Sequence, residues 1–130
     1  MTARCIPESP TFATVSEQQV WERLREGLPG DCVLMANLRL TDEVKDHEID
    51  LLALIPEAGF VCLEVKGGSV WLESDGWRIN RGGTVERCDP VAQAREGKHA
   101  LRRYVEADPA WGSRDQVAFS HGVVLPHSTL

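Results

Sequence analysis

Three ionisable residues lie in or beside apolar runs of this chain, where an unpaired charge is unfavourable. Asp50 precedes the run Leu51–Ile55, and Glu64 and Lys66 follow the run Phe60–Leu63. Ionised groups in such positions must be paired or must bind something, because burial of an isolated charge is costly. Two carboxylates with a lysine one side chain away suit a divalent cation and a phosphate group. The cation would activate water, and the lysine would stabilise the negative charge that develops during phosphodiester hydrolysis.

The register of one hairpin decides whether the two carboxylates meet. Side chains alternate along a strand, so Glu64 and Lys66 share a face and Val65 points the other way. A loop of three or five residues around Pro56–Gly59 places Asp50 opposite Glu64, whereas a loop of four residues turns Asp50 to the other face. We expect the odd-numbered loop, because it closes the site. The simpler alternative is a structural ion pair of Lys66 with Glu64 or Asp50 at a strand end.

The elements that must position these residues follow from periodicity and turn residues. Ser16 is the expected N-cap of a helix over 17–27, with Gln19 completing a capping box. Asp89-Pro90 opens a second helix that runs to about 106, and Asp75-Gly76 predicts a type I′ hairpin. The expected strands cover 32–40, 49–55, 60–66, 70–73 and 77–80, with a last strand or strand pair at 117–119 and 123–125. This order predicts an α/β or α+β domain with a mixed central β-sheet flanked by helices.

Length and composition describe an ordinary globular domain. The chain has 130 residues, of which 42% are hydrophobic and 26% charged, enough for one domain with a hydrophobic core. We expect residues 1–15 to form an irregular or extended arm and 16–130 to form the domain, as a fragment of a longer protein. No stretch approaches the ~18–20 apolar residues of a membrane helix, and the N-terminus lacks the apolar core of a secretory signal. We therefore expect a cytoplasmic protein with no membrane partner. The four cysteines have no C-x-x-C spacing and do not indicate a zinc site.

Charge is distributed unevenly along the chain. The net charge of −6 argues by itself against nucleic-acid binding. Residues 78–103, however, contain seven basic and three acidic residues and carry +4. Arg95, Lys98 and Arg102 fall on one stripe of the helix that also presents Gln93. This basic stripe is either a surface that follows a phosphate backbone or a solvated helix face.

Several short motifs occur in a fixed order over residues 14–125. They are Ser16-Glu17-Gln18-Gln19-Val20-Trp21, Glu48-Ile49-Asp50-Leu51-Leu52, Phe60-Val61-Cys62-Leu63-Glu64-Val65-Lys66-Gly67-Gly68, Asp75-Gly76-Trp77 and Asp89-Pro90-Val91-Ala92-Gln93-Ala94. In this combination the chain resembles the PD-(D/E)XK nuclease superfamily and, more narrowly, the nuclease-related domain (NERD). E-V-K-G with an upstream E-I-D and a downstream D-P-x-x-Q-A is specific, whereas any one of these motifs alone is weak. The resemblance implies a restriction-endonuclease-like core and a metal-dependent nuclease that hydrolyses DNA phosphodiester bonds.

The resemblance also implies a role for individual residues. The metal ligands would be the Asp50 and Glu64 carboxylates and the backbone carbonyl of Val65. Lys66 would be the catalytic lysine, Glu17 would orient a metal-bound water, and Gln93 would hold Lys66 or a phosphate. The implied cofactor is Mg²⁺ or Mn²⁺. The implied partners are DNA and a helicase domain in the same chain, with a superfamily 1 helicase as the first expectation.

Other interpretations stay open at this point. A non-catalytic nucleic-acid-binding or interaction module could keep a vestigial nuclease pocket, and a purely structural domain could use the E-x-K pair as an ion pair. Glu17 could be a helix N-terminal carboxylate that favours the helix dipole. Glu48 could be a second acidic ligand or a loop carboxylate, and Gln93 could be an exposed helix glutamine.

Overall fold

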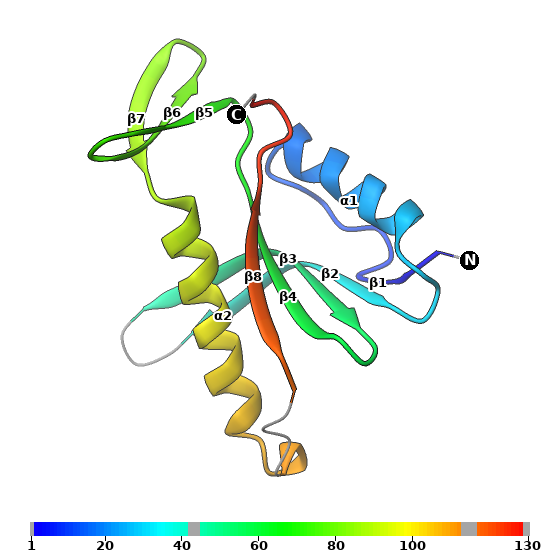
Figure 1. The fold of residues 1–130 in the computed structure, drawn as a ribbon. Helices are drawn as coiled ribbons and strands as arrows, with labels where there is room; N and C mark the ends of the chain where they lie inside the picture. Colours follow the sequence, from blue (N-terminus) through cyan, green and yellow to red (C-terminus); the bar gives the residue numbers. More distant parts are fainter. Residues whose placement is uncertain (1, 42–44, 113–116, 129–130) are drawn as a thin grey trace.

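The protein forms a mixed five-stranded sheet, a smaller three-stranded sheet and two helices (Figure 1). The computed structural model describes residues 2–41, 45–112 and 117–128. The elements in chain order are β1 (Arg4–Ile6), α1 (Val15–Gly27), β2 (Val33–Thr41), β3 (Asp46–Ile55), β4 (Gly59–Val65), β5 (Ser69–Glu73), β6 (Gly76–Arg81), β7 (Thr84–Cys88), α2 (Pro90–Glu106), a 3-10 turn (Pro109–Trp111) and β8 (Phe119–Val124). The predicted mixed sheet flanked by helices is confirmed, and the arrangement is compatible with a restriction-endonuclease-like core.

The large sheet has the strand order β1-β2-β3-β4-β8. The β1–β2 and β4–β8 pairs are parallel, and the two pairs between them are antiparallel. Helix α2 lies on the crossover from β4 to β8. Sequence reasoning did not identify β1, within the expected arm, or β7 as strands. The last strand is single. In the part of the chain that the structure describes, no helix is long and apolar enough to span a lipid bilayer.

The start of α1 differs from the sequence prediction. Thr14, not Ser16, is the N-cap, and its hydroxyl oxygen accepts a hydrogen bond from the Glu17 backbone N–H at 3.2 Å. The capping box is therefore Thr14-x-x-Glu17. Ser16 lies inside the first turn and is buried, because it packs against Gly67 after β4. The predicted cap of α2 is confirmed, since Asp89 accepts a hydrogen bond from the Ala92 backbone N–H at 3.0 Å.

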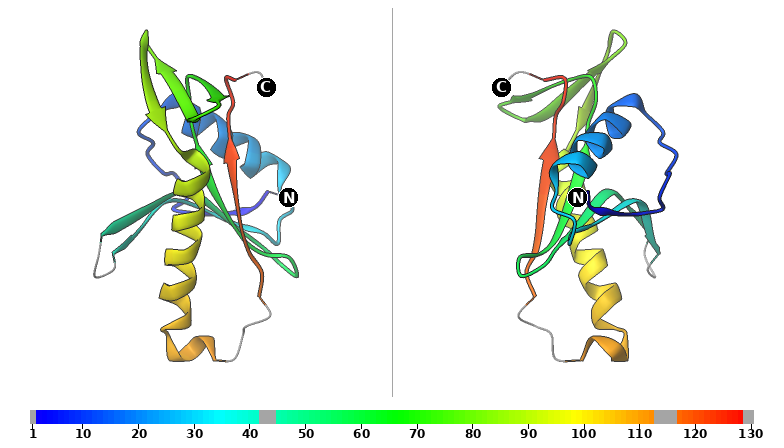
Figure 2. Two further views of the ribbon diagram at one scale, coloured as in Figure 1. Left: turned by 60° about the vertical axis from the view of Figure 1, so that its left-hand side comes forward. Right: turned by 90° about the vertical axis from the view of Figure 1, so that its right-hand side faces the viewer.

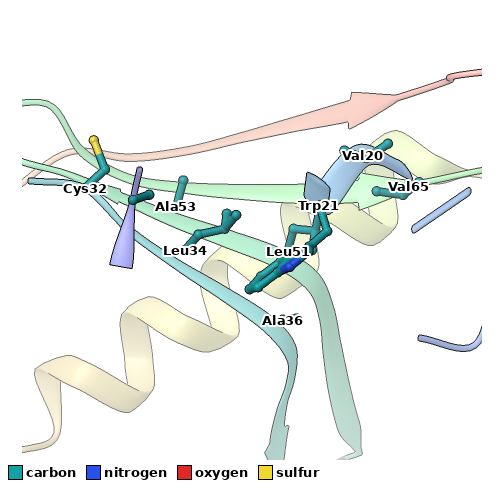
Figure 3. Close-up of a cluster of buried hydrophobic side chains, with 9 residues drawn as sticks. Val20, Trp21, Cys32, Leu34, Ala36, Leu51, Ala53 and Val65 are labelled. Atoms are coloured by element: carbon teal, nitrogen blue, oxygen red, sulfur yellow. The ribbon is translucent and has the colours of Figure 1, made fainter. Parts of the chain in front are cut away.

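Two apolar clusters lie on opposite faces of the large sheet. Val20 and Trp21 of α1 pack over Leu51 and Val65 on one face (Figure 3). On the other face Leu101 of α2 belongs to a second cluster. The remaining buried members of this second cluster are Leu40, Ile49, Leu52, Cys62 and Ala100. Each helix thus fixes one side of β3 and β4, and the N-terminal ends of the helices border the end of β4.

The small sheet, β5–β7, stands beyond the N-terminal end of α2 (Figure 2). The predicted hairpin is confirmed, but the predicted type I′ turn is wrong. Glu73 pairs with Gly76, so Ser74 and Asp75 form the turn. A type I′ turn needs positive φ at both central residues. Gly76 has φ +131°, whereas Asp75 is not among the residues with positive φ.

The β3–β4 connection confirms the odd-numbered loop. Ile55 pairs with Gly59 across three loop residues, and Leu51 pairs with Leu63. One step further along this register, Asp50 and Glu64 occupy opposite positions. Gly59 permits the turn because its φ is +113°, and a Cβ there would lie 2.2 Å from the Ala118 carbonyl oxygen.

Gly59→Ala should destabilise the fold. Positive φ alone costs an ordinary residue about 1–2 kcal/mol, and the clash with Ala118 should raise the total loss to about 2–4 kcal/mol. Gly83→Ala is the matched control, because Gly83 has φ +94° and open space around its Cβ position. Urea denaturation of both variants measures the difference. Equal losses for the two variants would mean that the close approach to Ala118 does not constrain the turn.

Candidate active site

The candidate site lies where β3 and β4 meet the N-terminal turns of both helices. A hollow of about 200 Å³ opens beside these strands, and Asp50, Glu64 and Gln93 line it. The other lining residues are Lys45, Asp46, His47, Glu48, Glu96 and Gly97. Three separate segments of the chain therefore converge on one acidic hollow.

Asp50 lies at an irregularity that two strands share. Ile49 packs with α2 and Leu51 with α1, although residues two apart in a regular strand share a face. Opposite Asp50 in β2 is Asn37, whose φ of +56° is left-handed. The ladder pairs Ala36 with Leu51 and Leu38 with Ile49 but skips the position between them. Asp50 is consequently half-buried at the point where both strands exchange their faces.

Asp50 reaches across to β4. Its Oδ2 accepts a hydrogen bond from the Val65 backbone N–H at 2.9 Å. Two effects oppose each other at this carboxyl. Burial raises its pKa, whereas the Val65 hydrogen bond and the charge of Lys66 lower it, and the net direction is upward.

Glu64 and Lys66 form a close pair at the end of β4. Lys66 Nζ lies 3.4 Å from Glu64 Oε1, and the two side chains are only 12% and 10% exposed. The ion pair that was the simpler alternative is thus present. It does not neutralise Asp50, so the group as a whole contains two carboxylates and one ammonium.

The charge of Asp50 disfavours the ionised form of Glu64. Burial, followed by the neighbouring Asp50 charge, raises the pKa of Glu64 to about 7, against the opposing effect of Lys66. The Asp50 and Glu64 side chains also share a hydrogen bond that favours ionised Asp50. Near neutral pH, one proton or one cation is therefore required between them.

Glu17 approaches from the first turn of α1. Burial and then the charge of Asp50 raise its pKa, while hydrogen bonds from the Ala13 and Thr14 backbones oppose this shift. Its Oε2 is buried and has no hydrogen-bond partner among the residues that the structure describes. Buried polar atoms are normally paired, so this oxygen is suited to contact a ligand or a water.

Gln93 and Glu48 border the hollow as exposed side chains. Glu96, one helical turn after Gln93, pairs with Lys45 at 3.0 Å. Sequence reasoning did not select Lys45, Asp46 or Glu96. The signal for Lys45 and Asp46 was the run Lys45-Asp46-His47-Glu48, which continues the acidic strand upstream of Asp50. Glu96 has no such signal.

The basic stripe lies on the other side of α2, next to β8. The Arg102 guanidinium carbon is 5.4 Å from the centre of the Phe119 ring, and its Nε donates to Glu106 Oε1 at 2.7 Å. Burial, followed by the charges of Lys98 and Arg95, lowers the pKa of His121 on β8. The structure therefore places the stripe and Gln93 on one helix but on different sides of it.

The donor set is suited to a hard cation. Carboxylates and a backbone carbonyl are the ligands that Mg²⁺ and Mn²⁺ prefer. The unpartnered Glu17 oxygen and the two competing carboxyls at Asp50 and Glu64 agree with this chemistry. Within residues 2–41, 45–112 and 117–128, no three histidine, cysteine or acidic side chains already surround one point.

A comparison with protein families gives one match. The family model NERD, described as a nuclease-related domain, matches residues 13–126. Neither a curated protein nor a solved structure matches the chain. The matched range includes α1, both central hairpin strands and α2.

Without divalent metal, the stability of the domain should depend on the Glu64 carboxyl. Its pKa is raised in the folded state from 4.5 to about 7, so folded Glu64 holds a proton that unfolded Glu64 releases. The stabilisation is complete below pH 4.5 and is lost as pH rises through 7. The wild type should lose about 2–3 kcal/mol relative to Glu64→Gln over this range. Urea denaturation at several pH values measures the difference, and parallel pH profiles for the two proteins would contradict it.

Proposed function

Since the chain belongs to the nuclease-related domain (NERD) family, we propose that it is a metal-dependent nuclease that hydrolyses DNA phosphodiester bonds. The observation that carries this proposal is the pairing of the buried Glu64 with Lys66 beside a second, half-buried carboxylate, Asp50, whose charge raises the pKa of Glu64. A structural ion pair with Lys66 needs only one carboxylate. The second carboxylate adds a negative charge that a bound cation would neutralise.

The metal would be held by the carboxylates of Asp50 and Glu64 and by the carbonyl of Val65. When bound, Mg²⁺ or Mn²⁺ would supply Lewis-acid polarisation of the phosphate and a more acidic water. Val65 is central to this arrangement, because its N–H already orients Asp50 at 2.9 Å. The backbone of this one residue would therefore position a carboxylate ligand through its N–H and supply a carbonyl ligand itself.

The other side chains would act on the substrate and on water. Lys66 Nζ would stabilise negative charge on the phosphate in the transition state. Glu17, with its buried and unpartnered Oε2, would accept a hydrogen bond from the attacking water and orient it. Gln93, at the rim of the hollow, would donate to a phosphate oxygen or hold Lys66.

The partners of the domain belong to the same proposal. DNA would follow basic side chains on the surface, among them Arg95, Lys98 and Arg102, through contacts to its phosphates. A helicase domain in the same chain would deliver the strand, and the cytoplasm would be the location. The match to the NERD family supports nucleic-acid processing in general.

The second candidate is a non-catalytic nucleic-acid-binding module. The 3.4 Å pair of Lys66 with Glu64 favours it, because this pair occupies both groups in the absence of metal. Binding of DNA that persists in EDTA, together with no cleavage at any Mg²⁺ or Mn²⁺ concentration, would support this candidate over the nuclease.

Nuclease activity should depend on Lys66. The purified domain should cleave labelled DNA in Mg²⁺ or Mn²⁺ and stop in EDTA. Lys66→Ala should lower the cleavage rate constant by about 100-fold or more, because a buried charge that stabilises the transition state is lost. Arg25→Ala is the control, since it removes an exposed cation from the last turn of α1. A Lys66→Ala variant that is folded and cuts as fast as wild type would rule out the assigned role.

Metal affinity should depend on the two carboxylates. Calorimetry with Mn²⁺ at pH 7.5 should detect binding to the wild type, and Asp50→Asn and Glu64→Gln should each weaken it by about tenfold or more, or about 1.4 kcal/mol. Glu26→Gln, an exposed position on α1, should bind as the wild type does. Equal affinity in all four proteins would place the metal elsewhere.

A further inference from the structure

The small sheet places an arginine beside the loop that follows Lys66. Gly68 comes two residues after Lys66 and has φ +74°. A Cβ at Gly68 would lie 2.6 Å from the Asn80 carbonyl oxygen and 3.7 Å from Arg81 Cγ. A larger residue would push β6 away from the loop. Glycine therefore allows the backbone of β6 and the stem of Arg81 to lie directly against the chain leaving the active site.

The charges of Arg81 and Lys66 both act on one residue of the small sheet, Cys88. Cys88, on β7, occupies the same face of the small sheet as Arg81, because Cys88 pairs with Trp77 and side chains alternate along β6. Burial raises the pKa of the Cys88 thiol, while the charges of Lys66 and Arg81 both lower it. With Arg78, three cations thus lower the pKa of this thiol.

Arg81 differs from the other two arginines of the small sheet. Arg78 is tied to Glu73 at 3.0 Å and to Asp75 at 2.7 Å, and Arg87 is tied to Asp75 at 2.8 Å. Arg81 is exposed. It has no ion pair or hydrogen bond among those found within the described residues. Its guanidinium remains available for an anion from outside the protein.

The opposite side of the site is unfavourable for an anion. The hollow between β3 and α2 is lined by five carboxyl groups, and Lys45, the lysine on its rim, is engaged by Glu96. The five are Asp46, Glu48, Asp50, Glu64 and Glu96. A phosphate backbone would be repelled from this side and attracted to the side of Lys66 and Arg81.

We propose that Arg81 binds a backbone phosphate of the nucleic-acid substrate next to the one served by Lys66, so that the β5–β7 sheet forms a wall of the substrate site. This proposal rests on the proposed function, because it assumes a nucleic-acid substrate at Lys66. A guanidinium suits the role, since its fork of donors matches two phosphate oxygens. Contacts to the backbone carry no base information, so this wall would hold any sequence.

The test measures DNA binding under conditions chosen to prevent cleavage. A fluorescein-labelled 20-nucleotide DNA, single-stranded and double-stranded, is titrated in EDTA and again in Ca²⁺, with fluorescence anisotropy as the readout. Arg81→Ala should weaken binding about fivefold to tenfold and reduce the salt-dependence slope by about 1. Arg81→Lys should recover part of the affinity, because it restores the charge without the fork. Arg87→Ala is the matched control, because Arg87 is a paired arginine on the same sheet, with its side chain 70% exposed.

The outcomes separate this inference from the nuclease proposal. If Arg81→Ala, folded as judged by thermal unfolding, binds with the affinity and salt slope of wild type and Arg87→Ala, the role of Arg81 is overturned. No DNA binding by the wild type in either buffer would overturn it too. Weaker binding by Arg81→Ala in a protein that cleaves no DNA would uphold the phosphate contact and reject the nuclease. Active protein in which Arg81→Ala leaves both KM and kcat unchanged would reject only the contact.

Discussion

The site depends on two carboxyl groups that the sheet forces together inside a poorly solvated pocket. The three-residue turn between β3 and β4 fixes the register that brings Asp50 opposite Glu64. Desolvation raises both pKa values, and the charge of Asp50 helps to raise that of Glu64 to about 7. The Val65 amide and the Lys66 ammonium offset this cost only in part. The Asp50 and Glu64 carboxyl groups therefore carry more negative charge than their surroundings neutralise. A proton compensates this charge at low pH, and a cation can compensate it at neutral pH.

The rest of the fold holds the Asp50 and Glu64 carboxyl groups in place. The shared irregularity at Asn37 and Asp50 turns the end of β3 so that Ile49 packs under α2. Gly97 makes this possible, because a Cβ there would lie 3.0 Å from Ile49 Cγ1. On the other face, Ser16 of α1 touches Gly67, where a Cβ would lie 2.3 Å from the Ser16 hydroxyl oxygen. These close approaches hold α1 against the end of β4 and α2 against β3, so that Glu17 and Gln93 both lie near Asp50.

Much of this arrangement could be predicted from the sequence, and the failures have physical causes. Apolar runs and the cap at Asp89 identified the central strands and α2, because those signals are local. The turn of β5–β6 was assigned wrongly, since Asp75-Gly76 is a strong type I′ pattern whose outcome depends on the register of the strands. The N-cap of α1 is Thr14 and not the expected Ser16, because Ser16 is buried against Gly67. The acidic hollow was only half predicted, since Glu96 reaches it through the fold and not through a motif.

The separation of charge explains how an acidic chain can suit an anionic substrate. The net charge of −6 is a sum over the whole molecule, whereas a phosphate responds to the potential within about one Debye length, about 8 Å. Carboxyl groups gather on the β3 side of the site, and the charges of Lys66 and Arg81 both act on Cys88 of the small sheet. A cation at Asp50 and Glu64 would reduce the repulsion between these two sides and the phosphate backbone. Under the proposed function, metal binding and nucleic-acid binding must therefore strengthen each other, because each supplies the charge that the other lacks.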